Sequence, residues 1–169
     1  MNPVRTAAVI GGAVLLQVTL LSQFSIAGAR PDVVLLVVLA FAFVHGPDDG
    51  AIVGFAGGLA LDVFISTPFG FTAFTYTVVG YAVGTWTAGV VRSAWWLAAV
   101  VLAAASAVAV FAQGLIGEVL GQDSLKGTPI TTIVAVVSVA TLLLAPLATR
   151  LAGWARADDR PRRRSIFAS

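Results

Sequence analysis

The sequence predicts an all-α membrane protein, a bundle of six transmembrane helices, on two observations. The first is composition: of 169 residues, 59% are hydrophobic and only 11% are charged, whereas soluble domains carry about 25% charged residues. A soluble fold of this size would leave apolar surface exposed to water, so lipid is the expected solvent. The second is that charged residues divide the chain into long uncharged segments, and a spanning helix needs about 20 mostly apolar residues.

The charge pattern gives the bounds of the six expected helices, which are 4–24, 32–45, 50–65, 70–91, 94–120 and 130–152. The third and fourth come from one segment that holds a single charge, Asp62, and is divided at the turn signal Ser66-Thr67-Pro68-Phe69-Gly70. The second helix is short, because 14 residues reach only about 21 Å. We expect the second and third helices either to lie in a thinned part of the bilayer or to form a re-entrant hairpin buried in protein.

These helices form one predicted domain, residues 1–152, followed by a basic cytoplasmic tail, residues 153–169, that is predicted to be disordered. The first helix has an alternative interpretation as a secretory signal peptide, since Ile26-Ala27-Gly28-Ala29 resembles a cleavage site of small residues. Its apolar stretch exceeds the ~7–15 residues of such a signal. An uncleaved helix is therefore favoured.

Basic residues predict the orientation, because positive charge marks the cytoplasmic side of a membrane protein. With the N-terminus inside, the outer segments hold only Arg30 and Lys126, and the inner segments hold the arginines at positions 5, 92, 150, 156, 160, 162, 163 and 164. Trp95, Trp96 and Trp154 fall at interfacial positions, whereas Trp86 is expected to pack inside helix four. The prediction is a multi-pass protein with both termini in the cytoplasm.

Small residues follow one face of the third expected helix. Gly50, Gly54, Gly58 and Asp62 recur every four residues, and the fourth helix repeats the pattern with Gly80, Gly84 and Ala88. Residues at this spacing are neighbours on a helix surface, and small ones let membrane helices approach closely. The pattern indicates tight packing and no particular activity.

Asp62 is the most informative polar residue, because a carboxylate within a membrane segment is costly, by ~2.5–3.5 kcal/mol on insertion scales. It should face protein or water and have a partner. Asp32 and Arg30 fall at the same predicted outer face, so we hypothesise a polar cluster of Arg30, Asp32 and Asp62. The alternative is an exposed interfacial aspartate without a partner.

Other polar residues favour structural roles. Gln17 and Gln23 could form hydrogen bonds between helices, and Glu118 is expected at the outer interface. The lone His45 and the following Asp48 and Asp49 are expected in an inner turn and an acidic loop, and no metal site or cofactor is predicted. The chain lacks a phosphate-binding Gly-Lys-Ser/Thr loop, a His-Glu-x-x-His pair and a Gly-x-Ser-x-Gly elbow. The basic tail is expected to set topology or to attract anionic lipid, and nucleic-acid binding is not expected.

Three stretches, taken in order, resemble the bacterial rod-shape-determining membrane protein family MreD. The first is Arg30-Pro31-Asp32 with the apolar run that follows. The second runs from Gly46-Pro47-Asp48-Asp49-Gly50 through the glycine row to Asp62. The third is Ser66-Thr67-Pro68-Phe69-Gly70, leading to Gly80-Tyr81. Together they cover roughly residues 30–84.

The resemblance implies a noncatalytic member of the cell-elongation machinery in the bacterial inner membrane. Such proteins bind the single-pass protein MreC and, through it, associate with the actin-like MreB filament and the peptidoglycan synthases. The positions matching the family pattern, which the resemblance assigns to fold or partner docking, are Pro31, Asp32, Gly54, Gly58, Asp62, Pro68 and Gly70. Gly80 and Gly84 join them through their small-residue face.

The family is similar in architecture to the substrate-binding subunits of energy-coupling-factor vitamin transporters, which makes transport the main alternative function. In that interpretation Asp32 and Asp62 line an outward-facing ligand pocket, and the small-residue faces contact the energy-coupling transmembrane subunit. An intramembrane enzyme built on Asp32, Asp62 and Glu118 is a third and weaker hypothesis.

Overall fold

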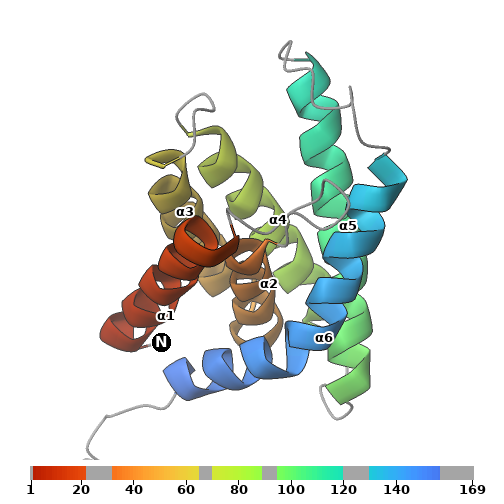
Figure 1. Ribbon diagram of the computed structural model, residues 1–169. Coiled ribbons are helices and arrows are strands. Elements are labelled where there is room, and N and C mark those ends of the chain that lie inside the picture. The colour runs from red at the N-terminus through yellow and green to blue at the C-terminus, as the bar shows by residue number, and fades with distance from the viewer. Residues whose placement is uncertain (1, 22–31, 65–69, 89–94, 120–129, 157–169) are drawn as a thin grey trace, which may run out of the picture.

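A computed structural model describes residues 2–21, 32–64, 70–88, 95–119 and 130–156. Within these ranges the protein has six α-helices and no strand (Figure 1), in agreement with the predicted all-α fold. The helices are α1 (Pro3–Leu16), α2 (Val33–His45), α3 (Pro47–Asp62), α4 (Phe71–Thr87), α5 (Trp95–Val119) and α6 (Ile130–Arg156), and a π-helical segment, η1 (Gln17–Leu21), continues α1. Pro31, Arg30, Pro68 and residues 157–169 of the predicted tail lie outside the described residues. Residues 153–156, expected in that tail, belong to α6.

The connection between α2 and α3 is a single residue, Gly46, and α3 begins earlier than the sequence predicted. Gly46 has φ 105°, a conformation that residues with a side chain rarely adopt. Pro47 then occupies the first turn, where its missing N–H costs nothing. Asp48 and Asp49, expected in a loop, lie in this first turn, because negative charge is favourable at the positive end of a helix.

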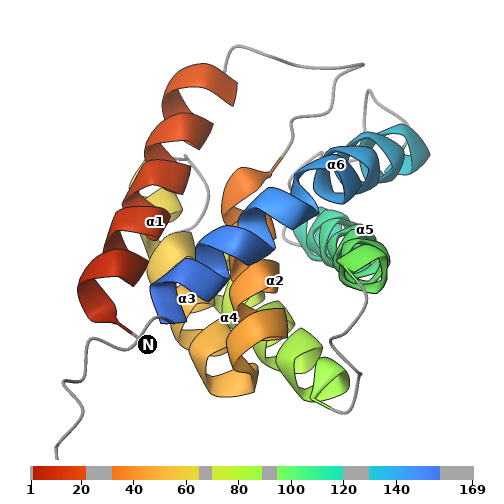
Figure 2. The ribbon, with the colours of Figure 1, turned by 90° about the horizontal axis from the view of Figure 1, so that it is seen from below.

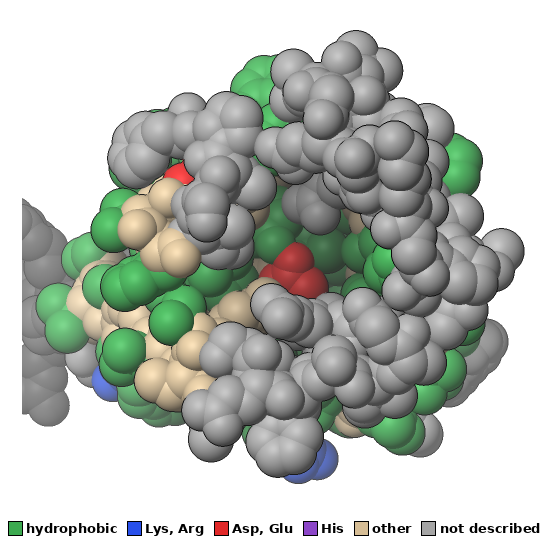
Figure 3. Space-filling model, turned by 45° about the horizontal axis from the view of Figure 1, so that its top comes forward, with side chains coloured by type: hydrophobic (Ala, Val, Ile, Leu, Met, Phe, Trp, Pro, Cys, Tyr) green, Lys and Arg blue, Asp and Glu red, His purple; other side chains and the backbone are tan. Residues whose placement is uncertain are grey.

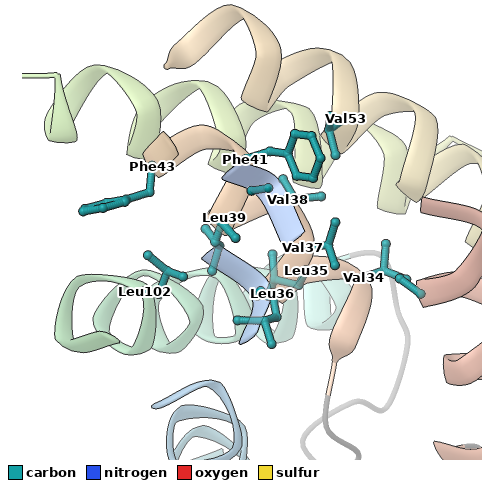
Figure 4. Packing of buried hydrophobic residues seen from close by; sticks show 14 of the residues in the cluster. Val34, Leu35, Leu36, Val37, Val38, Leu39, Phe41, Phe43, Val53 and Leu102 are labelled. Atoms are coloured by element: carbon teal, nitrogen blue, oxygen red, sulfur yellow. The ribbon is translucent and has the colours of Figure 1, made fainter. Parts of the chain in front are cut away.

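α2 is the centre of the bundle, and it packs against each of the other five helices. Every residue from Val34 to Phe43 is buried, as expected of a helix that is apolar on all sides. Figure 4 shows the surroundings of this core, in which Phe41 points towards Val53 of α3 and Phe43 lies near Leu102 of α5. A helix of 13 residues is too short to span a bilayer unaided, and here it is enclosed by protein.

The start of α1 and the end of α6 meet at one end of the bundle (Figures 1 and 2). α6 contains Pro146 and changes direction along its length, so that its second half runs beneath α2 towards the start of α1. The backbone N–H of Asn2 donates to the carbonyl of Ala155 (3.2 Å), and the Arg5 guanidinium lies 4.9 Å from the centre of the Trp154 ring. These contacts join the first turn of α1 to the last turn of α6.

One helical stretch in the described part of the chain, Ile133–Ala155, is both long enough and apolar enough to cross a membrane. Three shorter apolar helical stretches accompany it, namely Pro3–Thr19, Val33–His45 and Ala98–Ala112. Trp86 does not pack inside the bundle as expected: it lies in the last turn of α4 and is 89% exposed. An exposed indole near a helix end suits an interfacial position.

Candidate functional site

The Asp62 carboxylate, at the last residue of α3, caps the start of α4. Its side chain is buried, and its two oxygens accept hydrogen bonds from the backbone N–H groups of Gly70 (2.9 Å), Thr72 (3.2 Å) and Ala73 (3.2 Å). The first N–H groups of a helix have no partner within the helix, and the N-cap residue of α4, Gly70, provides no side-chain cap. Asp62 therefore supplies from a neighbouring helix the acceptors and the negative charge that a helix N-terminus favours.

A second carboxylate, Asp32, caps α2 together with a glutamine from the end of α1. Asp32 accepts hydrogen bonds from the backbone N–H of Leu35 (2.9 Å) and from the side-chain amide of Gln17 (3.2 Å). The Gln17 carbonyl oxygen in turn accepts from the N–H groups of Val33 (2.7 Å) and Val34 (3.3 Å). Gln17 lies in η1, a helix type that often occurs at functional positions.

Tyr76 links this second cap to α4. Its hydroxyl donates to the other oxygen of Asp32, and the ring is among the largest fully buried side chains. A buried tyrosine usually finds a partner for its hydroxyl. One turn earlier on α4 are Thr72 and Ala73, which donate to Asp62. The two carboxylates therefore both hold α4, at adjacent turns.

The predicted polar cluster is only partly visible in this arrangement. Arg30 lies outside the described residues, and no hydrogen bond joins Asp32 to Asp62 in the described part of the chain. The two residues form separate helix caps. Sequence reasoning identified both carboxylates but missed Tyr76 as a partner, and nothing in the sequence separates Tyr76 from Tyr81 or from the threonines of the same helix.

The glycine rows of α3 and α4 lie against each other. A Cβ atom at Gly54 would come within 2.6 Å of the Tyr76 carbonyl carbon, and one at Gly58 within 2.5 Å of the Ala73 Cα atom. Further along, a Cβ atom at Gly80 would lie 2.5 Å from the carbonyl oxygen of Gly50. A Cβ atom added at Gly84 would likewise overlap backbone atoms of Pro47. These positions are covered inside the protein, where only glycine allows the two backbones to approach so closely.

The other candidate residues have roles in the fold. Gly70 has φ 94° at the start of α4, a conformation that favours glycine. The His45 ring stacks on Phe41 with 5.1 Å between ring centroids. Among the residues that were searched, no group of three His, Cys, Asp or Glu side chains is placed to hold a metal ion. The arrangement of Gln17, Asp32, Asp62 and Tyr76 can fix helix ends in an apolar surrounding.

One face of the molecule is hollowed, with an acidic side chain at the bottom of the hollow (Figure 3). Hydrophobic side chains lie around it in this view (Figure 3). The two capping carboxylates form the candidate site, and the hydrogen bonds described for their oxygens come from the chain's own donors.

A family model described as rod shape-determining protein MreD matches residues 6–149. The chain belongs to the MreD family. Membership confirms the resemblance inferred from residues 30–84 and identifies a membrane protein of the cell-shape class, and the match extends through α5 and most of α6. No curated protein and no solved structure matches the chain, so the expected likeness to energy-coupling-factor substrate-binding subunits has no structural support here.

Proposed function

We propose that this MreD-family protein is a noncatalytic membrane scaffold of the cell-elongation machinery. In this proposal it binds an MreC-like single-pass protein and, through it, helps to organise the MreB-like filament and the peptidoglycan synthases. The observation that carries the proposal, beside the family match, is the use of the buried carboxylates. The oxygens of Asp62 and Asp32 accept hydrogen bonds from the chain's own donors, which is an architectural use of a costly group.

The proposed localisation is the bacterial inner membrane, in a multi-pass arrangement with both termini in the cytoplasm. The contact between Asn2 and Ala155 supports it, because adjacent termini require an even number of crossings. The length of α5 also supports it, since 25 residues reach about 38 Å, and so does the stretch Ile133–Ala155 of α6, which is long and apolar enough to cross a membrane. The arginines of the predicted tail follow α6 directly, on the side that positive charge favours.

The proposed mechanism is a rigid platform. We assign Gly54, Gly58, Gly80 and Gly84 to the α3–α4 contact, and the pair Asp32 and Asp62 to holding α4 in place. Pro31, Pro68 and Gly70 are assigned to the connections that lead into α2 and α4. The platform then presents outward-facing side chains such as Phe55 and Phe74, which are 54% and 67% exposed, to lipid or to the helix of a partner.

Purification of the tagged protein from its native membrane in mild detergent, with mass spectrometry of the proteins recovered, tests the proposal. Recovery of a single-pass, coiled-coil partner together with cell-wall synthases is the expected result. Phe55→Ala and Phe74→Ala should reduce recovery of the partner while leaving the bundle folded, and Leu143→Ala on the exposed face of α6 is the matched control. Recovery without any single-pass partner would contradict the scaffold.

A transporter subunit is the second candidate, and the hollow with an acidic floor in Figure 3 is the observation in its favour. In this alternative the protein binds a small vitamin-type molecule and associates with ATPase subunits. The same purification separates the two functions, because ATPase subunits or a tightly bound small molecule would accompany a transporter and would overturn the scaffold.

A further inference from the structure

A groove of about 400 Å³ runs between α4 and α5. α4 contributes residues 79, 82, 83, 86 and 87, and α5 contributes residues 101, 104, 105, 108 and 109. Each set follows the i, i+3, i+4, i+7, i+8 spacing of one helix face. The groove therefore lies between one continuous face of α4 and one of α5.

The lining of the groove is almost wholly hydrocarbon. Thr87 is its one hydroxyl-bearing residue, and that hydroxyl donates to the Val83 carbonyl of its own helix (2.7 Å). Small-molecule sites of this size usually contain a few polar groups that orient the ligand, and beside Thr87 the only polar group among these side chains is the indole N–H of Trp86 at one end. Its occupant must be apolar along the whole contact.

The groove is too small to be a stable protein–protein interface. Nine residues on each wall, 79–87 and 101–109, span about 12 Å at ~1.5 Å per residue. The lining is far smaller than the ~800 Å² that each partner of a stable protein interface buries.

We propose that this groove binds one acyl chain of a membrane phospholipid, with the headgroup at the Trp86 end. A phospholipid is the apolar chain available to a membrane protein, and a single file of methylene groups is narrower than a helix. Trp86, 89% exposed in the last turn of α4, supplies the indole that favours the headgroup level of the bilayer. Ala104, Ala105 and Ala109 leave the width that longer side chains would fill.

Quenching of Trp86 fluorescence by a brominated lipid tests the site. The chain has four tryptophans, so the variant Trp95→Phe/Trp96→Phe/Trp154→Phe leaves Trp86 as the reporter. The purified protein in detergent is titrated with phosphatidylglycerol brominated near the ester end of its acyl chains, the part that the proposal places beside Trp86. The expected result is quenching that saturates at one lipid per protein, whereas quenching that rises linearly with lipid would overturn the proposal.

Two substitutions fill the groove from opposite walls, Ala105→Phe on α5 and Ala82→Phe on α4. Each should raise the half-saturating lipid concentration about tenfold, the effect of displacing roughly two methylene groups. Val139→Phe is the control, because Val139 lies on α6 outside the groove and is 56% exposed. Saturation that both groove variants leave unchanged would place the lipid elsewhere and overturn the proposal.

A second measurement does not depend on the groove variants folding. Val108, 69% exposed at the groove wall, is replaced by the photo-cross-linking residue benzoylphenylalanine in cells, and the intact mass of the product is measured. An adduct with the mass of one phospholipid supports the site. An adduct with a protein, whether a single-pass partner or a second copy of this chain, or no adduct at all, overturns it.

Discussion

The α3–α4 pair and the α5–α6 pair are both antiparallel neighbours in the chain, yet they are joined differently. α3 and α4 approach through glycines, so that a single added Cβ atom at Gly54 or Gly58 would meet backbone atoms. α5 and α6 are also in contact, and the one polar link described between them is the Ser138 hydroxyl donating to the Ala103 carbonyl (3.5 Å). Beside α5 there is room for the groove.

The difference shows where individual residues matter. Packing of backbone on backbone requires glycine at set positions, and helix ends enclosed in an apolar surrounding require a carboxylate at a set position, because no water is there to satisfy their N–H groups. The α5–α6 pair needs only small apolar side chains of suitable size, which many sequences provide. Residues 30–84, on which the family resemblance was based, include the glycine contacts and the carboxylate caps.

Loss of the Asp62 cap should have the largest effect. Asp62→Ala leaves three N–H groups of α4 without an acceptor, at ~1–3 kcal/mol for each buried group, so we expect a loss of more than about 3 kcal/mol in the free energy of unfolding. Asp62→Asn keeps one oxygen for Gly70 and Ala73, which share Oδ2, and should lose about half as much. Unfolding of the purified protein by SDS, followed by circular dichroism, measures both.

The control is Asp48→Ala, because Asp48 is exposed in the first turn of α3. This substitution should lower the free energy of unfolding by less than about 1 kcal/mol. Equal losses for the substitutions at positions 48 and 62 would show that the cap contributes little and would remove the proposed distinction between the two helix pairs.

The Gly54 contact should come next. Gly54→Ala places a methyl group against the Tyr76 carbonyl, and overpacking of this kind costs about 1–3 kcal/mol. Gly12→Ala is the matched control, because nothing lies within 4 Å of the added atom and alanine stabilises a helix interior by roughly 0.5–1 kcal/mol relative to glycine. The thermal stability of the two variants in detergent should therefore shift in opposite directions. A stabilising Gly54→Ala would contradict the backbone contact.

The hydroxyl of Tyr76 should contribute less than the glycine contact. Tyr76→Phe keeps the buried ring and removes one donor to Asp32, which we expect to cost about 1–1.5 kcal/mol. Tyr81→Phe is the control on the same helix, at a side chain that is 51% exposed. Identical SDS unfolding curves for the two variants would show that Asp32 does not depend on this hydrogen bond.

The sequence was sufficient to predict the six helices, because charges and turn signals mark the ends of the apolar segments; that all six cross the membrane stays a prediction. It also indicated tight packing on the small-residue faces of α3 and α4, since glycines four residues apart lie on one face, but not that these two faces meet. It did not predict that Asp62 returns to the N-terminus of α4, because that depends on the path of the chain between α3 and α4. Gln17 and Tyr76 are far from Asp32 in sequence, and no periodic pattern relates them.

The sequence analysis misplaced the start of α3 and the end of α4. Asp48 and Asp49 indicated a loop, yet acidic residues after a proline are also favourable in the first turn of a helix, and α3 begins at Pro47. Trp86 was assigned to the interior because the expected fourth helix ran to residue 91. α4 ends at Thr87, which places the indole near the helix end.

The smallest effect is expected at the contact between the first turn of α1 and the last turn of α6. The Arg5 guanidinium stacks over Trp154 and donates to its carbonyl oxygen (3.4 Å), and a cation–π contact at a partly exposed site contributes about 0.5–1 kcal/mol. Arg5→Ala should therefore lower stability by that amount, whereas Arg150→Ala, at an exposed residue of the same helix as Trp154, should not change it measurably. Proteolysis after the last turn of α6 should also accelerate in Arg5→Ala alone, because this contact holds α6 to α1. If instead both variants unfold and are cleaved like the parent protein, α6 is held by its packing against α2 and α5, and the contact between Arg5 and Trp154 does not stabilise the bundle.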